Sequence, residues 1–151
     1  MDVQRLIDQN EIRNLAARFT AAVNRSDAKS LGDLFTEDGE WHVPGMPTTV
    51  GRQAAAERIG GLRSTFANLI QLLHSGHADV NGDRATAEWY LSETASDADG
   101  NGFAFTGVYQ DEMVRTADGW RFARRSFTFL YRGKADLRGK WYPHPGAPAQ
   151  G

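Results

Sequence analysis

The chain has 151 residues, of which 40% are hydrophobic and 24% are charged, a composition typical of one globular domain rather than of a disordered segment. The 17 basic and 19 acidic side chains give a net charge of −2, which argues against binding to nucleic acid or to an anionic membrane. The absence of cysteine excludes disulfide bonds, thiolate metal sites and a cysteine nucleophile. The sequence shows neither a signal peptide nor an apolar run long enough to span a membrane, so we expect a cytoplasmic protein.

The first third of the chain predicts helices. Apolar residues recur at spacings of three and four over residues 3–23, the pattern of an amphipathic helix. A second, shorter helix follows, capped by Ser26 or Asp27 and ending at Asp38. A third, alanine-rich helix is expected over residues 52–62, where two consecutive glycines mark its end.

The second half of the chain changes to the two-residue period of β-strands. Alternating patterns over residues 69–80 and 84–96 flank an Asn-Gly-Asp turn at residues 81–83, which is a strong hairpin signal. Two further strands are expected over residues 103–116 and 120–132. The apolar phase shifts within the last of these, which predicts a β-bulge or a sharp bend.

These elements predict one α+β domain over residues 1–133, with a further short strand at residues 40–43. We expect a cone-shaped barrel of a strongly bent mixed or antiparallel sheet, wrapped by three N-terminal helices. Residues 134–151 contain three prolines and predict an irregular tail. A cone of this kind encloses a pocket suited to a small apolar ligand.

Two histidines are the first candidates for chemistry. His74 and His77 form a His-x-x-His pattern, which on a helix would suggest a metal site. On a strand, residues three apart face opposite sides of the sheet, so we expect no bound metal and one histidine inside the cone. That histidine is either a packed, hydrogen-bonded residue or a general base, since its unperturbed pKa of about 6.5 suits proton transfer at neutral pH.

Two adjacent arginines lie on the last predicted strand. Because side chains alternate along a strand, one of Arg124 and Arg125 must face inward. An inward guanidinium in an apolar cone needs a carboxylate or a developing oxyanion as partner. The alternative is a salt bridge at the wide, solvated mouth of the cone.

The order of elements also carries a family resemblance. The run Leu31-x-x-Leu34-Phe35-Thr36-x-Asp38-x-x-Trp41, followed by a glycine that opens a helix, resembles the SnoaL-like branch of the nuclear transport factor 2-like superfamily. The stretch from His74 to Leu91 is similar to bile-acid 7α-dehydratases, scytalone dehydratases and lindane dehydrochlorinases. The resemblance covers residues 3–132 and implies the predicted fold.

The resemblance also implies a site. In these enzymes a histidine–aspartate dyad lies in the cone, where the histidine abstracts a proton. The histidine position falls on His74, whereas the aspartate position falls on Asn24, which can orient the imidazole but carries no charge. A tyrosine of the bile-acid enzyme is replaced by Phe19. Arg125 matches a pocket arginine, which favours it over its neighbour as the inward residue and as a stabiliser of negative charge.

A substrate-binding surface is expected around this dyad, with Trp41 matching a pocket tryptophan of the family. The residues that we expect to contact substrate are Phe19, Trp41, Leu69, Tyr90, Tyr109 and Phe127.

Two functions remain open at this stage. The first is a cofactor-independent lyase or isomerase of the dehydratase, cyclase or double-bond isomerase type, with His74 as general base, Asn24 as its partner and Arg125 as charge stabiliser. The second is a non-catalytic domain that binds a hydrophobic ligand or serves as an accessory subunit. In both cases the expected partner is a small hydrophobic or cyclic metabolite, with no cofactor and no metal, and we expect a homo-oligomer, a dimer or a trimer.

Overall fold

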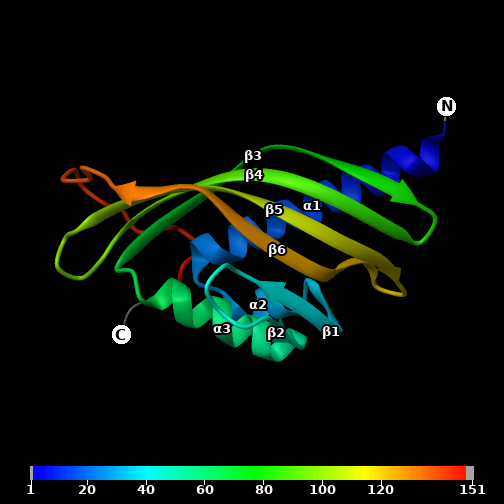
Figure 1. The fold of residues 1–151 in the computed structure, drawn as a ribbon, viewed down its shortest axis with the longest axis horizontal. Coiled ribbons are helices and arrows are strands. Elements are labelled where there is room, and N and C mark those ends of the chain that lie inside the picture. The colour runs from blue at the N-terminus through cyan, green and yellow to red at the C-terminus, as the bar shows by residue number, and fades with distance from the viewer. Residues whose placement is uncertain (1, 149–151) are drawn as a thin grey trace.

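The computed structural model describes residues 2–148, which form three helices and a curved sheet (Figure 1). Helix α1 spans Val3–Arg25 and begins at Asp2, whose carboxylate accepts a hydrogen bond from the backbone N–H of Arg5 at 3.2 Å. It ends at Ser26, which adopts the left-handed conformation with φ 57°. The first predicted helix is confirmed, but its predicted apolar stripe is buried only from Ile12 to Val23, whereas Val3, Leu6 and Ile7 are exposed.

Helix α2, Ala28–Gly32, is shorter than predicted. Asp27 caps it by accepting a hydrogen bond from the backbone N–H of Ser30 at 3.2 Å. The expectation that this helix continues to Asp38 is wrong, because strand β1, Phe35–His42, starts earlier. Phe35 aligns with Phe122 in the sheet and is fully buried, so its apolar side chain belongs to the core and not to a helix face.

Helix α3, Arg52–Ser64, follows the two-residue strand β2, Thr49–Val50, and continues past the glycines that were expected to end it. A Cβ at Gly60 would lie 3.1 Å from the Cβ of Ala28. This glycine therefore allows α2 and α3 to approach closely and does not end the helix.

Four long strands complete the fold and confirm the period-two prediction. They are β3 Asn68–Asn81, β4 Arg84–Ser96, β5 Gly102–Thr116 and β6 Gly119–Lys134. The predicted β3–β4 hairpin turns at Gly82, whose φ of 62° favours glycine. The pairing register between β5 and β6 shifts between Glu112 and Met113, which confirms the bulge predicted from the phase shift in β6.

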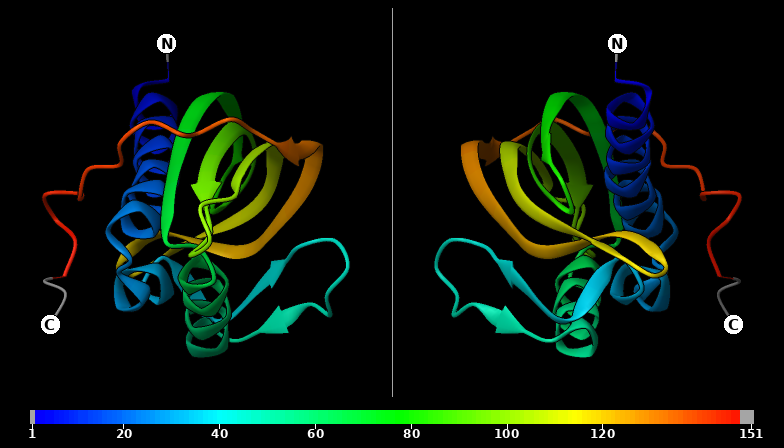
Figure 2. Two further views of the ribbon diagram at one scale, coloured as in Figure 1. Left: turned by 90° about the vertical axis from the view of Figure 1, so that its left-hand side faces the viewer. Right: turned by 90° about the vertical axis from the view of Figure 1, so that its right-hand side faces the viewer.

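The six strands form one sheet in the order β2-β1-β6-β5-β4-β3. Strand β1 pairs with β6 in parallel and every other pairing is antiparallel, so the sheet is mixed. The sheet curls strongly without closing into a barrel, with α1 along its β3 side and α2 and α3 below its open end (Figure 2). The α+β cone architecture is therefore confirmed, as an open sheet.

Helix α1 covers the exposed edge of the sheet with hydrogen bonds as well as with apolar contacts. The Gln9 side chain donates to the carbonyl of Ala78 at 3.2 Å, and the Arg13 guanidinium donates to the carbonyl of Gly76 at 3.4 Å. These side chains satisfy carbonyls that an edge strand would otherwise leave unpaired. The face of α1 that packs on the sheet is thereby held in one orientation.

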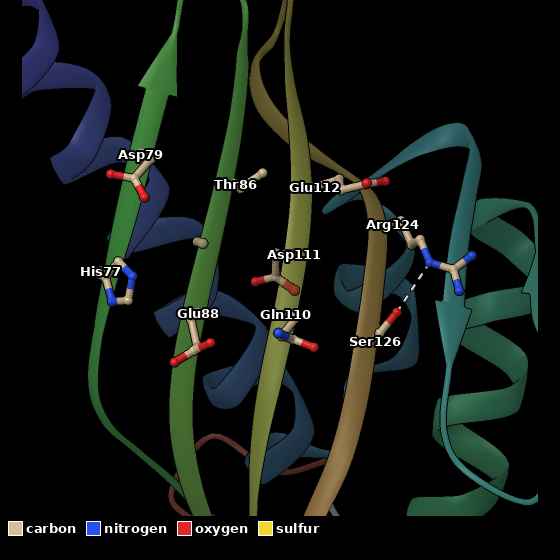
Figure 3. A pocket seen from close by; sticks show the side chains of 10 residues that line it. His77, Asp79, Thr86, Glu88, Gln110, Asp111, Glu112, Arg124 and Ser126 are labelled. Carbon is tan, nitrogen blue, oxygen red and sulfur yellow. Dashed lines mark hydrogen bonds between the residues drawn. The ribbon is translucent and has the colours of Figure 1, made fainter.

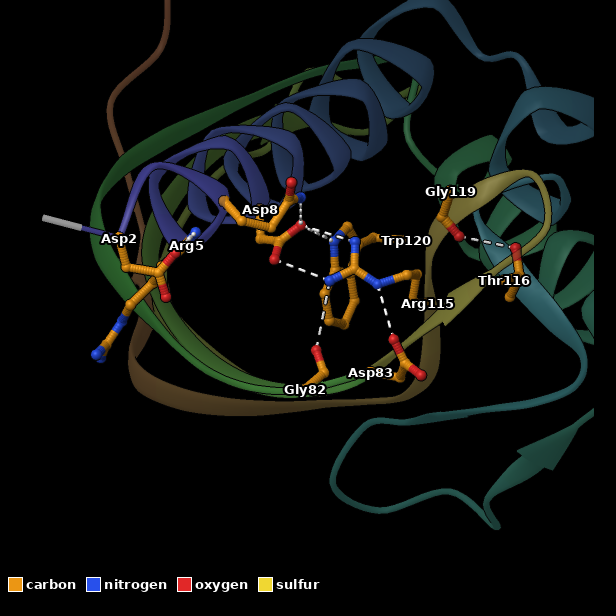
Figure 4. A network of polar contacts seen from close by, with 10 residues as sticks. Asp2, Arg5, Asp8, Gly82, Asp83, Arg115, Thr116, Gly119 and Trp120 are labelled. Carbon is orange, nitrogen blue, oxygen red and sulfur yellow. Dashed lines mark hydrogen bonds and ion pairs between the residues drawn. The ribbon is translucent and has the colours of Figure 1, made fainter.

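A second contact fixes the N-terminal end of α1 (Figure 4). Asp8 is 3% exposed and accepts two hydrogen bonds from the Arg115 guanidinium, both at 2.8 Å, and one from the Trp120 indole at 3.2 Å. The hydrogen bonds from Arg115 lower the pKa of Asp8 to about 2. Arg115 also donates to Asp83 at 2.9 Å, so one guanidinium joins α1 to the ends of β4 and β5.

The chain beyond β6 forms no helix or strand over residues 135–148. The N–H of Ala135 donates to the carbonyl of Gly102 at 3.0 Å, and a Cβ at Gly146 would lie 2.8 Å from the side chain of Arg25. The tail therefore passes back to the C-terminal end of α1, as Figure 2 shows. Residues 149–151 of the predicted tail lie outside the described residues. Within residues 2–148, no helix combines the length and apolarity needed to cross a membrane.

Candidate active site

A cavity of about 660 Å³ lies on the concave side of the sheet, bounded by the end of α1, by α3 and by the loop after β1. Its size suits a small organic molecule. The walls are mainly apolar and include eight aromatic side chains, those of Phe19, Trp41, Phe66, Phe103, Phe105, Tyr109, Phe127 and Phe129. Its charged side chains are Arg63, Glu93, Arg132 and Lys134.

Most of the predicted substrate-contacting residues do line this cavity. They are Phe19, Trp41, Leu69, Tyr109 and Phe127. Tyr90 is an exception, and its assignment is wrong. It is 42% exposed on the convex face of the sheet, where its hydroxyl donates to Glu88 at 3.2 Å.

His74 does not enter the cavity, so the prediction that it points into the cone is wrong. It is exposed, and its Nε2 lies 2.7 Å from the hydroxyl of Ser92. Leu69 and Gln71 are the buried residues of this part of β3, so the residue at 74 falls on the opposite face.

His77 is exposed as well, although residues three apart on a regular strand should face opposite sides. The β3–β4 register shifts between Leu73 and Gly76, and this bulge changes the phase of the strand between the two histidines. His77 lies beside a shallow groove of about 340 Å³ on the outer face, among the side chains drawn in Figure 3. Neither histidine therefore contributes to the cavity.

The predicted contact between Asn24 and His74 is wrong for the same reason. The Asn24 side chain instead pairs with the backbone of Gln71: its Oδ1 accepts from the Gln71 N–H at 2.7 Å, and its Nδ2 donates to the Gln71 carbonyl at 2.9 Å. Asn24 thus continues the row of α1 side chains that cover the edge of β3. Its amide supplies the donor and the acceptor that a neighbouring strand would supply.

The inward position that the histidine was expected to occupy belongs to Gln71. This side chain accepts a hydrogen bond from the Thr20 hydroxyl at 2.9 Å and donates to Glu93 Oε1 at 2.8 Å. A chain of hydrogen bonds therefore runs along the cavity wall, from Thr20 on α1 through Gln71 on β3 to Glu93 on β4. It holds one oxygen of the Glu93 carboxylate in place.

Glu93 is the functional candidate that sequence reasoning missed. Burial in the cavity wall raises its pKa, against the opposing effects of the Gln71 hydrogen bond and of the Arg63 charge. A signal was present, because Leu91 and Ala95 place Glu93 in the buried phase of β4. A charged side chain in that phase marks either a paired core residue or a site.

Tyr109 and Trp41 form a second polar feature of the cavity. The Trp41 indole N–H donates to the Tyr109 hydroxyl oxygen at 3.2 Å, so the tyrosine hydrogen remains available to another acceptor. Burial raises the pKa of Tyr109 well above its usual value, and the charge of Glu93 adds to the shift. This phenol therefore stays protonated and acts as a hydrogen-bond donor.

Arg125 is the inward arginine, as predicted, and it forms an ion pair with a carboxylate. It is 1% exposed and its Nε donates to Asp111 at 2.9 Å, whereas Arg124 is half-buried and pairs with Glu40 at 3.1 Å. Burial raises the pKa of Asp111, and the Arg125 charge opposes that shift.

The guanidinium of Arg125 is enclosed by aromatic rings. Its central carbon lies 4.3 Å from the ring centroid of Phe19, 3.8 Å from that of Tyr109 and 4.4 Å from that of Phe122. Arg125 thus lies behind the cavity wall rather than in its lining, so the expected direct stabilisation of substrate charge is not supported. It supports the ring of Tyr109 from behind.

The described part of the chain offers no ready metal site. Among residues 2–148, no three histidine, aspartate or glutamate side chains lie close enough together to hold a metal ion. The polar groups of the cavity are a carboxylate, a phenol, an amide, a threonine hydroxyl, an indole N–H and three cationic side chains. This set can move a proton, donate a hydrogen bond to a developing oxyanion and bind an anion.

Comparison with known proteins places this geometry in a family. Residues 4–126 match the SnoaL-like domain. An uncharacterised protein of Mycobacterium tuberculosis is 24% identical over 135 residues, which cover 87% of this chain and 92% of that protein.

Among the solved structures that share the fold are two from Novosphingobium species. A protein of Novosphingobium aromaticivorans of the nuclear transport factor 2-like type, with a cystatin-like fold, is 30% identical, has a TM-score of 0.68 and covers 85% of each chain. Hexachlorocyclohexane dehydrochlorinase from Novosphingobium barchaimii is 18% identical, has a TM-score of 0.85 and covers 95% of this chain and 100% of its own. With its matched domain and its open, curled sheet around an aromatic cavity, the chain belongs to the SnoaL-like family of the nuclear transport factor 2-like superfamily.

Proposed function

We propose that the protein is a cofactor-independent lyase or isomerase, of the dehydratase, cyclase or double-bond isomerase type, acting on a small, largely apolar cyclic substrate. The observation that carries this proposal is the carboxylate of Glu93 in the wall of an aromatic cavity. Glu93 takes the role of general base that His74 was expected to fill. The family resemblance supports the reaction class, since the fold is shared with a dehydrochlorinase.

The environment of Glu93 suits proton transfer from carbon. Gln71 holds Oε1, and among the described residues no hydrogen bond is made to Oε2, which leaves that oxygen for substrate. The raised pKa makes the carboxylate a stronger base than an exposed glutamate and brings it closer to neutral pH.

Tyr109 supplies the complementary group. When Glu93 takes a proton from the carbon next to a carbonyl, the C–H electron pair moves into the new C=C bond and the carbonyl oxygen becomes an enolate. The Tyr109 hydroxyl, already accepting from Trp41, donates to that oxygen. The enolate then either expels a leaving group, with its bonding electron pair, from the β-carbon, giving a lyase, or, where the substrate carries a β,γ double bond, takes the proton back from Glu93 at the γ-carbon, giving an isomerase.

One observation favours a second function, a non-catalytic ligand-binding or accessory domain. Asn24 and the backbone of Gln71 satisfy each other's hydrogen bonds, and among residues 2–148 no histidine lines the cavity. A binding domain needs the cavity but needs no base. The two functions differ in whether the cavity turns over what it binds.

Proton exchange into 2-tetralone, a bicyclic ketone with acidic α-hydrogens, distinguishes them. We expect the wild-type protein in D₂O, with no cofactor added, to accelerate loss of the α-hydrogen NMR signals. Glu93→Gln should lower this rate by about 10²–10⁴-fold, the usual contribution of a general base, whereas His74→Gln should leave it unchanged.

Stability serves as the control for this experiment. Glu93→Gln removes a carboxylate that burial disfavours and keeps the shape of the side chain, so its free energy of unfolding at pH 7 should not fall. Saturable binding of the ketone without any acceleration of exchange would support the binding domain and overturn the lyase or isomerase proposal.

A further inference from the structure

The cationic side chains of the cavity are gathered at one end. Arg132 and Lys134 lie on the last residues of β6, and Arg63 lies at the C-terminal end of α3. Among the described residues, none of the three has a carboxylate within ion-pair distance, whereas five other arginines of the chain do. These cations are therefore available to an external anion.

Arg63 has few polar partners for its degree of burial. One of its terminal nitrogens donates to the carbonyl of Phe66 at 3.2 Å, but its Nε is buried and has no hydrogen-bond partner among the described residues. Burial lowers the pKa of Arg63, so its charge lacks full hydration there. An anion bound in the cavity would supply the counter-charge that this partly dehydrated guanidinium lacks.

Partly exposed aromatic rings lie next to these cations. The rings of Phe103 and Phe105 are stacked with centroids 6.4 Å apart, and Phe66 meets their edges at 6.0 and 6.1 Å. Phe129 lies 6.0 Å from Phe105, and the guanidinium of Arg132 lies over it at 5.1 Å. The same end of the cavity thus offers an apolar surface and unpaired positive charge.

The strand register links this end to Glu93. Gln71, Glu93, Phe105 and Arg132 are successive cross-strand partners on β3, β4, β5 and β6. Glu93 and Arg132 are thus two strands apart in one row, or about 10 Å between backbones. A fused pair of rings lying on Phe105 would reach from one residue to the other.

We propose that the ligand of this cavity is an anionic amphipathic molecule, an apolar ring system that carries a carboxylate or a similar oxyanion bound by Arg63, Arg132 and Lys134. The inference deepens the proposed function, because it assigns a substrate class to the same cavity. The anion fixes the orientation of the ring system and directs its far end towards Glu93. Within residues 2–148, Glu93 is the one carboxylate that lines the cavity, and the strand register places it two strands away from Arg132.

Two fluorescent probes test this directly. 8-Anilinonaphthalene-1-sulfonate and N-phenyl-1-naphthylamine have the same ring system and differ by the sulfonate. We expect the sulfonate to bind the wild-type protein at least about tenfold more tightly, since charge-assisted hydrogen bonds contribute roughly that much. In the double variant Arg132→Gln, Lys134→Gln, which leaves Arg63 in place, that preference should fall severalfold, while the affinity for the neutral amine stays unchanged.

A matched control separates local recognition from net charge. The double variant Arg18→Gln, Lys29→Gln removes the same two charges from exposed positions outside the cavity and should keep the wild-type preference. Equal affinities of the two probes for the wild-type protein, an equal loss in both double variants, or no binding of either probe would overturn the proposal.

The outcome is independent of catalysis. If the wild-type protein shows no preference for the sulfonate but keeps its base-dependent exchange, the anionic substrate is rejected and the proposed reaction stands. A retained preference without any exchange would leave an anion-selective binding cavity.

Discussion

Asn24 is held by the two halves of its amide, one donating and one accepting. Its side chain could be placed on the inner face of α1 from the sequence, because the helical period fixes that face. Its partner could not be predicted, since the choice between a histidine ring and a strand backbone depends on how far β3 slides along the helix. In the structure the partner is the backbone of Gln71, a residue that belongs to no recognisable motif.

This pairing predicts that Asn24→Asp destabilises the fold instead of restoring a catalytic dyad. An ionised aspartate would place a negative oxygen against the Gln71 carbonyl and lose the donor that binds it. We expect the free energy of unfolding at pH 7 to fall by about 1–3 kcal/mol, the usual cost of leaving such a group unsatisfied. Urea denaturation measures this.

Asn14→Asp, at an exposed position on the same helix, is the matched control and should change stability little. An Asn24→Asp protein as stable as the wild type, with higher activity, would restore the dyad.

Strands β3 and β6 show what the sequence reveals about an element. The bulge in β6 was predictable, because its inner face carries large apolar residues on both sides of a phase shift. The bulge in β3 was not. Ile70 and Leu72 are exposed while Leu69 is buried, so both faces of this strand are apolar. The apolar pattern therefore does not tell which face His74 lies on. A Cβ at Gly76 would lie 2.3 Å from the Trp89 ring, so the close approach of the two strands at the bulge requires glycine there.

The pair Arg125 and Asp111 joins β5 to β6 and provides the second prediction. Both are cross-strand partners in the core, so removing one leaves the other as an uncompensated buried charge. We expect Arg125→Met to lower the free energy of unfolding by about 3–5 kcal/mol. The double variant Arg125→Met, Asp111→Leu should recover most of that loss, as measured by urea denaturation.

Activity of the double variant separates a supporting role from a catalytic one. Because Arg125 lies behind Tyr109 and outside the cavity lining, the refolded double variant should keep most of the exchange activity. A stable double variant whose activity has fallen by several orders of magnitude would show that the buried charge itself takes part in the reaction.

At the scale of the whole molecule, the change from helical to strand periodicity near residue 69 was enough to predict the cone. The sequence pattern could not show which residues, distant in the chain, hold the first helix against the sheet. The contact of Asp8 with Arg115 and Trp120 spans more than a hundred residues of chain and rests on two side chains with no local pattern. It joins the first helix to the far end of the sheet.

This contact predicts a contribution to stability that depends on pH. The pKa of Asp8 is lowered to about 2, so its ion pair stabilises the fold above the ordinary aspartate pKa of about 4 and is lost as the pH falls towards 2. Asp8→Asn should therefore be less stable than the wild type at pH 7, by about 1–3 kcal/mol, with the difference shrinking below pH 4. Thermal unfolding at several pH values measures it.

Asp136→Asn is the matched control, because Asp136 also pairs with an arginine but is exposed. It should cost little at any pH. A difference between wild type and Asp8→Asn that stays constant from pH 7 to pH 2 would show that the charge of Asp8 does not stabilise the fold.

The pH profile of α-proton exchange in the wild type, Glu93→Gln and His74→Gln tests the central claim, that the half-buried Glu93 of the cavity wall is the base. We predict that the wild-type rate rises with pH above the ordinary glutamate range, because burial raises the pKa of Glu93 and the carboxylate is the active form. The same rise should persist in His74→Gln and be absent from Glu93→Gln. A rise that survives in Glu93→Gln and is lost in His74→Gln would contradict the account and return the reaction to the histidine.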